Sequence, residues 1–166
     1  MQREQHIHRR RPRWILIILL VLVVIFGLHH FLSTGARLNA NWNKIVYTSS
    51  DNVAIAVYSP KTHRTYTSTN APKHKFHTAS TVKVSILAGL LLKQQSPLSS
   101  NQLSLAKEMI EQSDNDATTT LFDELGGQEG LQETFNKFGM KDSVAHKSWG
   151  LTTTTPADQI KLLNNI

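Results

Sequence analysis

The feature that most constrains this chain is a run of fifteen uncharged and almost wholly apolar residues, 14–28 (WILIILLVLVVIFGL). With the four residues that follow, the run reaches nineteen, close to the ~20 that a helix needs to cross a bilayer. A core helix would normally carry a polar face, and this run has none. We therefore expect a transmembrane signal anchor over residues 14–32. A signal peptide that is cleaved near the small residues 33–36 is the alternative.

Charge is concentrated in front of this run. Residues 1–14 hold five arginines and one glutamate, which account for +4 of the net charge of +6. Basic residues before an anchor favour the cytoplasm, so residues 1–13 are expected to be a cytoplasmic tail and the rest to face outward. The rest of the chain is nearly neutral, which argues against nucleic acid as a partner. The chain has no cysteine, so its outer part would depend on a packed core rather than on disulfides.

The part after the anchor is expected to be a linker, 33–44, and one folded domain, 45–166. Residues 53–58 alternate in polarity and residues 64–68 are rich in Thr and Tyr, which predicts a β-hairpin around a turn at Ser59–Pro60. Helices are expected over 79–94, 104–112, 116–125 and 128–138, and another begins at Thr155–Pro156. A hairpin followed by a helical lobe indicates an α+β fold. Since one hairpin is too little sheet alone, it either packs on helices or pairs with strands beyond residue 166.

The first chemical motif is Ser80 and Lys83, in the sequence STVK at the start of the most apolar helix, where Thr78 is the expected N-cap. Residues three apart on a helix lie on one face, so the amine can reach the hydroxyl. Dehydration favours the neutral form of an amine, which can then accept a proton from serine. The pattern alone is weak, because Ser104 and Lys107 also fit it. A lysine that extends its amine to water is the alternative interpretation.

The second motif is Ser113, Asp114 and Asn115, between two predicted helices. Its ordinary interpretation is a turn and a helix cap, for which all three residue types are suited. Its functional interpretation is a serine that relays a proton and an asparagine that binds a substrate amide. Asp114 would brace the turn.

In this order the two motifs resemble those of the penicillin-recognising serine enzymes, which include class A β-lactamases and the D,D-peptidases called penicillin-binding proteins. The stretches FHTASTVKVSILAGLLL, MIEQSDNDATTTLFDELGG and TTTTPADQIKLLNNI are similar to the segments of that superfamily around its active site. The resemblance covers residues 45–166. It implies an α+β fold of the α/β-sandwich type, as in β-lactamases and transpeptidases.

The resemblance implies a role for each matching residue. Ser80 would form the acyl-enzyme, and its backbone N–H would supply half of an oxyanion hole. Lys83 would accept the serine proton directly or through water. Ser113 would pass a proton to the leaving nitrogen, and Asn115 would bind the substrate amide. No metal or cofactor is implied, and His63, His74 and His77 are too scattered for a metal site.

Two departures from the superfamily pattern stand out. No Lys-Thr-Gly or Lys-Ser-Gly follows the second motif, so we expect the chain to be the N-terminal portion of a longer enzyme. Class A β-lactamases also carry a glutamate that activates the deacylating water. The corresponding stretch here, 145–151, has no acidic residue, and its His146 is expected to be a surface side chain rather than a base.

The sequence thus predicts a monomeric, membrane-anchored serine hydrolase outside the cytoplasm. It would act on a β-lactam or on a peptide amide of the cell wall through an acyl-enzyme. The alternative is a non-catalytic anchored module that binds wall peptide or a partner protein. Turnover of the adduct would separate a β-lactamase from a wall peptidase.

Overall fold

The computed structural model describes residues 13–94 and 97–166, without the side chains of residues 13 and 29–38. The chain divides into two compact units, 1–41 and 42–166. Most of the predicted basic tail, residues 1–12, lies outside the described residues.

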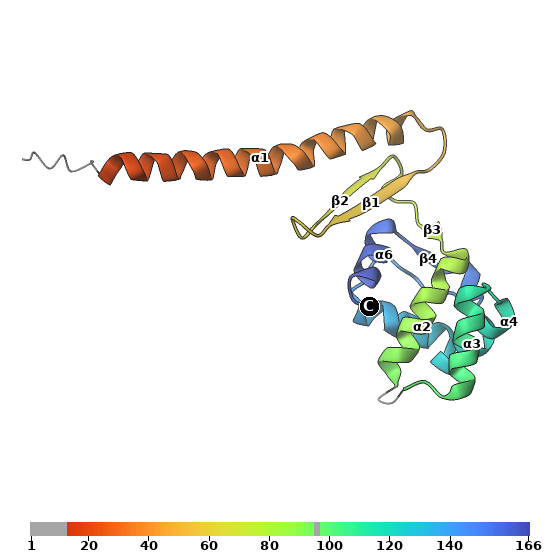
Figure 1. Ribbon diagram of the computed structural model, residues 1–166. Helices are drawn as coiled ribbons and strands as arrows, with labels where there is room; N and C mark the ends of the chain where they lie inside the picture. Colours follow the sequence, from red (N-terminus) through yellow and green to blue (C-terminus); the bar gives the residue numbers. More distant parts are fainter. Residues whose placement is uncertain (1–12, 95–96) are drawn as a thin grey trace, which may run out of the picture. The chain divides into compact units, whose positions relative to one another are not determined.

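The first unit is built from helix α1 (Arg13–Thr48), whose C-terminal turns belong to the second unit (Figure 1). Large apolar side chains of residues 14–28 are exposed along it, with Phe26 at 75%. Among the residues that the structure describes, no helix combines the length and apolarity needed to span a membrane. The predicted transmembrane segment 14–32 therefore has no support from the structure.

Residues 33–44, which the sequence analysis assigned to a linker, are helical, because α1 continues through this range and ends only at Thr48. Contacts within the second unit explain the helical end. Val46, one turn after the half-buried Trp42, is fully buried. The side chain of Asn43 accepts a hydrogen bond of 2.6 Å from the Ser68 hydroxyl. Tertiary packing of this kind overrides a weak local helix propensity.

The predicted hairpin is present as the antiparallel strands β1 (Ala54–Ser59) and β2 (Arg64–Thr69). The register pairs Ile55 with Ser68 and Val57 with Tyr66. In the described part of the chain each of the two strands pairs only with the other, and the hairpin packs against α6 (Pro156–Leu163). Helix packing supplies the support that an isolated hairpin lacks.

A second, very short sheet was not expected from the sequence. It pairs β3 (Phe76–His77) with β4 (Thr153–Thr154), and Val144 forms a bridge to Thr153. Next to this sheet the Thr78 N–H donates to the Thr152 carbonyl at 2.8 Å. These bonds join the segment that leads to Ser80 with the segment that follows residues 145–151.

The helical lobe surrounds helix α2, which begins after a short 3-10 turn, η1 (Figure 1). Helix α3 starts four residues earlier than predicted because Ser99 and Gln102 form a capping box. The further bounds are η1 Ala79–Thr81, α2 Val82–Lys93, α3 Ser100–Glu111, α4 Asn115–Leu125, α5 Gly127–Lys137 and η2 Trp149–Leu151. The α+β class with a helical lobe is thereby confirmed.

The core lies where α2 is enclosed by α3, α4 and α5. Its fully buried large side chains include Ile86, Met109, Leu121, Leu131 and Phe135. The predicted end of a helix at residue 125 is confirmed, since Gly126 ends α4 at φ +112°, a conformation that only glycine adopts easily.

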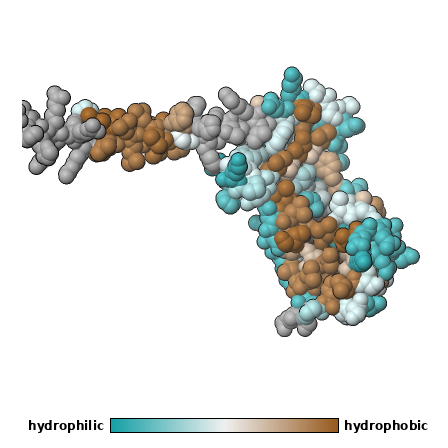
Figure 2. Space-filling view, viewed as in Figure 1, coloured by the Kyte–Doolittle hydropathy of each residue, from teal (hydrophilic) through white to brown (hydrophobic). Residues whose placement is uncertain are grey.

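An apolar groove of about 600 Å³ remains open beside the core, between α2 and α3. Figure 2 shows apolar residues gathered on this face of the helical lobe. Leu91, Leu103 and Ile110 line the groove and are each about half exposed.

Candidate active site

Ser80 lies in η1 at the mouth of the lobe, with its side chain exposed. The turn is sharp: Ala79, directly before Ser80, has φ +45°, and the Thr78 carbonyl accepts from both the N–H and the hydroxyl of Thr81. The predicted cap by Thr78 is wrong, because its hydroxyl makes no capping bond and is buried without a hydrogen-bond partner. A left-handed non-glycine residue is strained, and such strain often marks a functional site.

Lys83 occupies the first turn of α2 and is 3% exposed. Its Nζ donates to the Ser113 carbonyl at 2.6 Å, to Ser113 Oγ at 2.8 Å and to Asn115 Oδ1 at 3.1 Å. A neutral amine has only two N–H groups, whereas an ammonium has three. Three oxygens thus lie within hydrogen-bond distance of Lys83 Nζ, enough to accept from each N–H of an ammonium, and the neutral amine expected from the sequence stays a prediction.

Ser113 connects the lysine to the nucleophile candidate. Its Oγ accepts from Lys83 and donates to Ser80 Oγ at 3.2 Å, so the lysine reaches Ser80 through Ser113. Ser113 has φ +55° at the corner between α3 and α4, and the next residue donates its N–H to the Glu108 carbonyl at 3.2 Å. The corner holds the Ser113 hydroxyl and carbonyl on the same side, toward Lys83.

Both remaining residues of the second motif have distinct positions. Asp114 braces the turn, because its carboxylate caps α4 by accepting from the Ala117 N–H at 2.7 Å. Asn115 is the first residue of α4 and is exposed, with its Oδ1 directed to Lys83. All four predicted site residues, Ser80, Lys83, Ser113 and Asn115, are thus brought together in one hydrogen-bonded group.

This group borders an open cleft of about 470 Å³. The cleft is lined on one side by Ala79, Ser80 and Asn115, and on the other by residues 148–151. No carboxylate is among these described lining residues. His146 is not among them either, and its Nδ1 accepts from the Ser148 N–H at 3.0 Å. The described lining of the cleft thus presents a serine hydroxyl and an amide. It contains no carboxylate or imidazole that could act as a base toward water.

Trp149 is a site residue that the sequence analysis missed. Its ring centroid lies 5.4 Å from Lys83 Nζ, and its indole N–H donates to Thr119 Oγ1 at 3.2 Å. A tryptophan within the stretch that lacks the acidic residue was the available signal, but nothing in the sequence indicates which way its ring points.

The second pair that fits the first motif provides an internal comparison. Ser104 lies on the exposed part of α3 and donates to Glu108 Oε1 at 3.3 Å. Lys107 lines the apolar groove rather than the cleft. Spacing alone therefore does not build the site, and the corner at Ser113 is what distinguishes the first pair.

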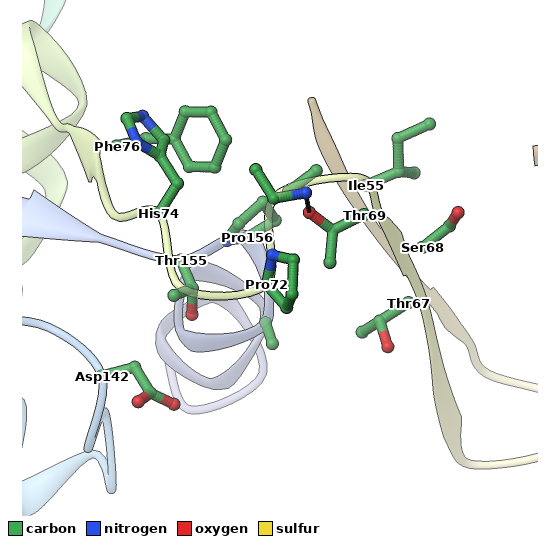
Figure 3. A pocket seen from close by; sticks show the side chains of 13 residues that line it. Ile55, Thr67, Ser68, Thr69, Pro72, His74, Phe76, Asp142, Thr155 and Pro156 are labelled. Carbon is green, nitrogen blue, oxygen red and sulfur yellow. Dashed lines mark hydrogen bonds between the residues drawn. The ribbon is translucent and has the colours of Figure 1, made fainter. Parts of the chain in front are cut away.

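A smaller cavity of about 190 Å³ lies between the hairpin and the start of α6 (Figure 3). Thr69, His74 and Pro156 line it, whereas none of the four predicted site residues does. Among the described residues no cluster of potential metal ligands is present. The three histidines that the sequence analysis considered as metal ligands have different hydrogen-bond partners. His63 contacts Tyr58, His74 contacts Asn52, and His77 contacts a backbone carbonyl.

Comparison with known proteins identifies the fold. Residues 88–166 match the sequence model of the Beta-lactamase enzyme family, a range that includes Ser113 and Asn115 but begins after Lys83. The structure is similar to a PBP-A mutant solved as an acyl-enzyme complex with penicillin G, with a TM-score of 0.64 and 23% identity. The fold is that of the β-lactamase-like superfamily. The predicted resemblance to β-lactamases and penicillin-binding proteins is thereby confirmed.

Two further solved structures have a similar fold. An ancestral (GNCA) class A β-lactamase gives a TM-score of 0.60 at 19% identity, covering 77% of this chain and 63% of that one. A β-lactamase from Desulfarculus baarsii DSM 2075 gives 0.56 at 20% identity, covering 78% and 62%. The PBP-A match covers 78% of this chain and 61% of PBP-A, so the β-lactamase-like chain spans under two thirds of its relatives' length. No curated protein matches the sequence closely enough to count as a relative.

Proposed function

We propose that this chain is a serine hydrolase in which Ser80 attacks an amide carbonyl and forms an acyl-enzyme. The observation that carries the proposal is the hydrogen-bonded series from Lys83 Nζ through Ser113 Oγ to Ser80 Oγ, with contacts of 2.8 and 3.2 Å, which opens onto the cleft. A serine hydroxyl needs a positioned proton acceptor to become a nucleophile. The family match and the fold support the same class of enzyme.

The relay works in both directions in this proposal. With Lys83 as a neutral amine, its Nζ accepts the Ser113 proton while Ser113 takes that of Ser80. A bond forms between Ser80 Oγ and the carbonyl carbon, and the carbon–nitrogen bond of the amide breaks. The leaving nitrogen receives the proton back from Lys83 through Ser113. Asn115 would bind the amide of the substrate beside Ser80.

The developing oxyanion needs hydrogen-bond donors. Ser80 lies in the first turn of a helical segment, where backbone N–H groups have no partner within the helix. Its N–H is therefore available as one donor. A β-lactam and a peptide amide of the cell wall both fit this chemistry, and penicillin G is the ligand of the PBP-A complex named above.

Slow release of the acyl group is part of the proposal. A deacylating water needs a base, and among the described lining residues of the cleft there is no carboxylate or histidine. A long-lived adduct is typical of a peptidase that is inhibited by penicillin, whereas rapid turnover defines a β-lactamase.

Covalent labelling of the full chain with a fluorescent penicillin tests the proposal. We expect a labelled band that Ser80→Ala abolishes. Ser104→Ala is the matched control, because Ser104 has the same spacing to a lysine but lies outside the cleft, and it should label like the parent. Absence of label in a folded parent chain would overturn the proposal and favour the alternative, a module that binds wall peptide or a partner without turnover.

We also propose a membrane location, with residues 42–166 outside the cytoplasm. The support comes from the sequence: five arginines precede the apolar residues 14–28, whose large side chains are exposed on α1. Fractionation of cells that express the full chain tests it. We expect the chain in the membrane fraction and a version without residues 1–32 in the soluble fraction, whereas a soluble full chain would contradict the proposal.

A further inference from the structure

The wall of the cleft opposite Ser80 is apolar and carries no charge. It consists of residues 148–151, and Trp149 and Leu151 supply its large side chains. Leu151 is 52% exposed although it is large and apolar, and Trp149 is half-buried. Most of the open surface of the described lining is therefore hydrocarbon. Such a surface beside a reactive group is suited to an apolar part of a ligand.

Hydrogen bonds on both sides of the Leu151 side chain fix the backbone of this wall. The Leu151 N–H donates to the Ser148 carbonyl at 2.8 Å, and the Leu151 carbonyl lies 3.1 Å from His77 Nδ1 on β3. The Thr152 carbonyl accepts from the Thr78 N–H at 2.8 Å. These bonds connect the wall to β3 and to the segment that leads into the turn of the nucleophile.

The Trp149 ring is held from α4. Its indole N–H donates to Thr119 Oγ1 at 3.2 Å, and the Thr119 hydroxyl donates to the Asn115 carbonyl at 2.9 Å. Asn115 also lines the cleft, so the indole and the amide that would bind the substrate share one support. A surface that is fixed before binding loses little conformational freedom when a ligand packs on it.

Charged side chains do not reach this wall. Lys83 is not among the described lining residues, and its amine bonds to Ser113 and Asn115. The acidic and basic side chains of α3, of the start of α4 and of the residue that precedes Ser148 are also outside the described lining: Lys107, Glu108, Glu111, Asp114, Asp116 and Lys147. A charged group placed against the wall would therefore lose water without gaining a partner of opposite charge.

We propose that Trp149 and Leu151 determine which side chain the site accepts on its substrate: they favour an uncharged, apolar group and disfavour a group that carries charge beside the amide. The inference rests on the proposed function, because the amide that Asn115 would bind places its substituent in the same cleft. The cleft of about 470 Å³ is large enough for an aromatic ring. Leu151 is in this role a specificity-determining residue with no part in the relay.

Penicillins that differ at a single carbon test the selectivity of the parent chain. Benzylpenicillin has an uncharged side chain, carbenicillin adds a carboxylate beside the amide, and ampicillin adds an ammonium at the same carbon. Their second-order rate constants for acylation of Ser80 are measured by competition with a fluorescent penicillin. We expect benzylpenicillin to react at least about tenfold faster than either charged analogue. Rate constants within about twofold of one another would overturn the proposal.

Leu151→Arg places a cation on the wall and leaves the relay intact. We expect the rate constant for carbenicillin, relative to that for benzylpenicillin, to rise by at least about threefold, whereas the ratio for ampicillin should not rise. The uncharged Leu151→Gln should weaken the preference for benzylpenicillin over both analogues alike. Leu103→Arg is the matched control, because Leu103 is 62% exposed but lines the apolar groove instead of the cleft. Its ratios should equal those of the parent.

A purely structural role of the wall predicts a different result. Leu151→Arg would then change all the rate constants by the same factor, and this outcome would overturn the proposal. An equal rise of the carbenicillin and ampicillin ratios would also overturn it. Trp149→Gln is read by the same ratios, because the ring lies 5.4 Å from Lys83 Nζ and its removal can slow every penicillin equally. We expect its preference for benzylpenicillin to fall to about threefold or less.

Reversible binding separates this proposal from the proposed function. Ser80→Ala cannot form an acyl-enzyme, and Trp14→Phe combined with Trp42→Phe leaves Trp149 as the sole indole of the chain. In this triple variant we expect benzylpenicillin to change the Trp149 emission with saturation, and carbenicillin to need an at least about tenfold higher concentration. If no penicillin labels the parent, the proposed function fails and this titration still decides the inference. Equal dissociation constants, or no saturable change in a folded chain, would overturn it.

Discussion

Replacement of Ser113 by alanine separates catalysis from stability. The change removes the oxygen that accepts from Lys83 at 2.8 Å and donates to Ser80 at 3.2 Å. Lys83 keeps its bonds to the Ser113 carbonyl and to Asn115, so its buried Nζ retains two of its three acceptors. Loss of these two hydrogen bonds at an exposed residue should lower the free energy of unfolding by only about 1–2 kcal/mol.

The effect on acylation should be much larger. Proton transfer by a positioned group contributes about 100- to 10,000-fold to a rate, which corresponds to about 3–5 kcal/mol of activation free energy. We therefore expect the second-order rate constant for labelling by a fluorescent penicillin to fall by at least a factor of about 100 in Ser113→Ala. The assay is a time course of labelling at several penicillin concentrations, with denaturant unfolding measured on the same samples.

Glycine at the same position provides the control. Ser113 has φ +55°, where a residue with a side chain is strained by roughly 1 kcal/mol, so Ser113→Gly should be more stable than Ser113→Ala. Both variants should label equally slowly, because both lack the hydroxyl. A labelling rate within about threefold of the parent in either variant would refute the relay. A labelling rate that is clearly higher in the more stable of the two variants would also refute the relay.

Three further predictions concern the cleft and its support. Gly150 lines the cleft with open space at its Cβ position, so Gly150→Glu should shorten the lifetime of the penicillin adduct, measured by loss of label, whereas the uncharged Gly150→Gln should not. Asp158 is fully buried and accepts hydrogen bonds from Ser143 Oγ at 2.9 Å and from Lys161 at 2.6 Å. Asp158→Ala should therefore lower the free energy of unfolding by roughly 3 kcal/mol, measured by denaturant unfolding. A loss below about 1 kcal/mol would contradict this. A Cβ at Gly130 would lie 2.2 Å from the Leu125 carbonyl oxygen, so Gly130→Ala should cost about 1–3 kcal/mol, while Gly150→Ala should be close to neutral.

The regular parts of the fold were predictable because their sequence signals are local. The hairpin alternates in polarity, and Thr155 and Pro156 begin α6 as predicted, with the Thr155 hydroxyl accepting from the Asp158 N–H at 3.3 Å. The partners of the Asp158 side chain were not predictable in this way. This side chain is used by the buried bonds to Ser143 and Lys161, which no local pattern indicates.

The residues of the candidate site were predictable from the sequence, but the order of the hydrogen bonds among them was not. The resemblance implied that Ser80 and Lys83 would share one site with Ser113, and the three side chains do meet. It could not indicate that Ser113 would stand between the other two, because that depends on a positive φ at a residue other than glycine. The contact of Trp149 with Lys83 was hidden for a similar reason, since its indole N–H bonds to Thr119, thirty residues away.

Peptide mapping of the penicillin adduct tests the central claim most directly. Trypsin separates the two candidate serines, because cleavage after lysine places Ser80 in the peptide 76–83 and Ser104 in the peptide 94–107. The account predicts that the adduct mass is found on peptide 76–83, with fragment ions that locate it on Ser80. An adduct on peptide 94–107, or spread over several peptides, would contradict the claim that the relay through Ser113 activates Ser80.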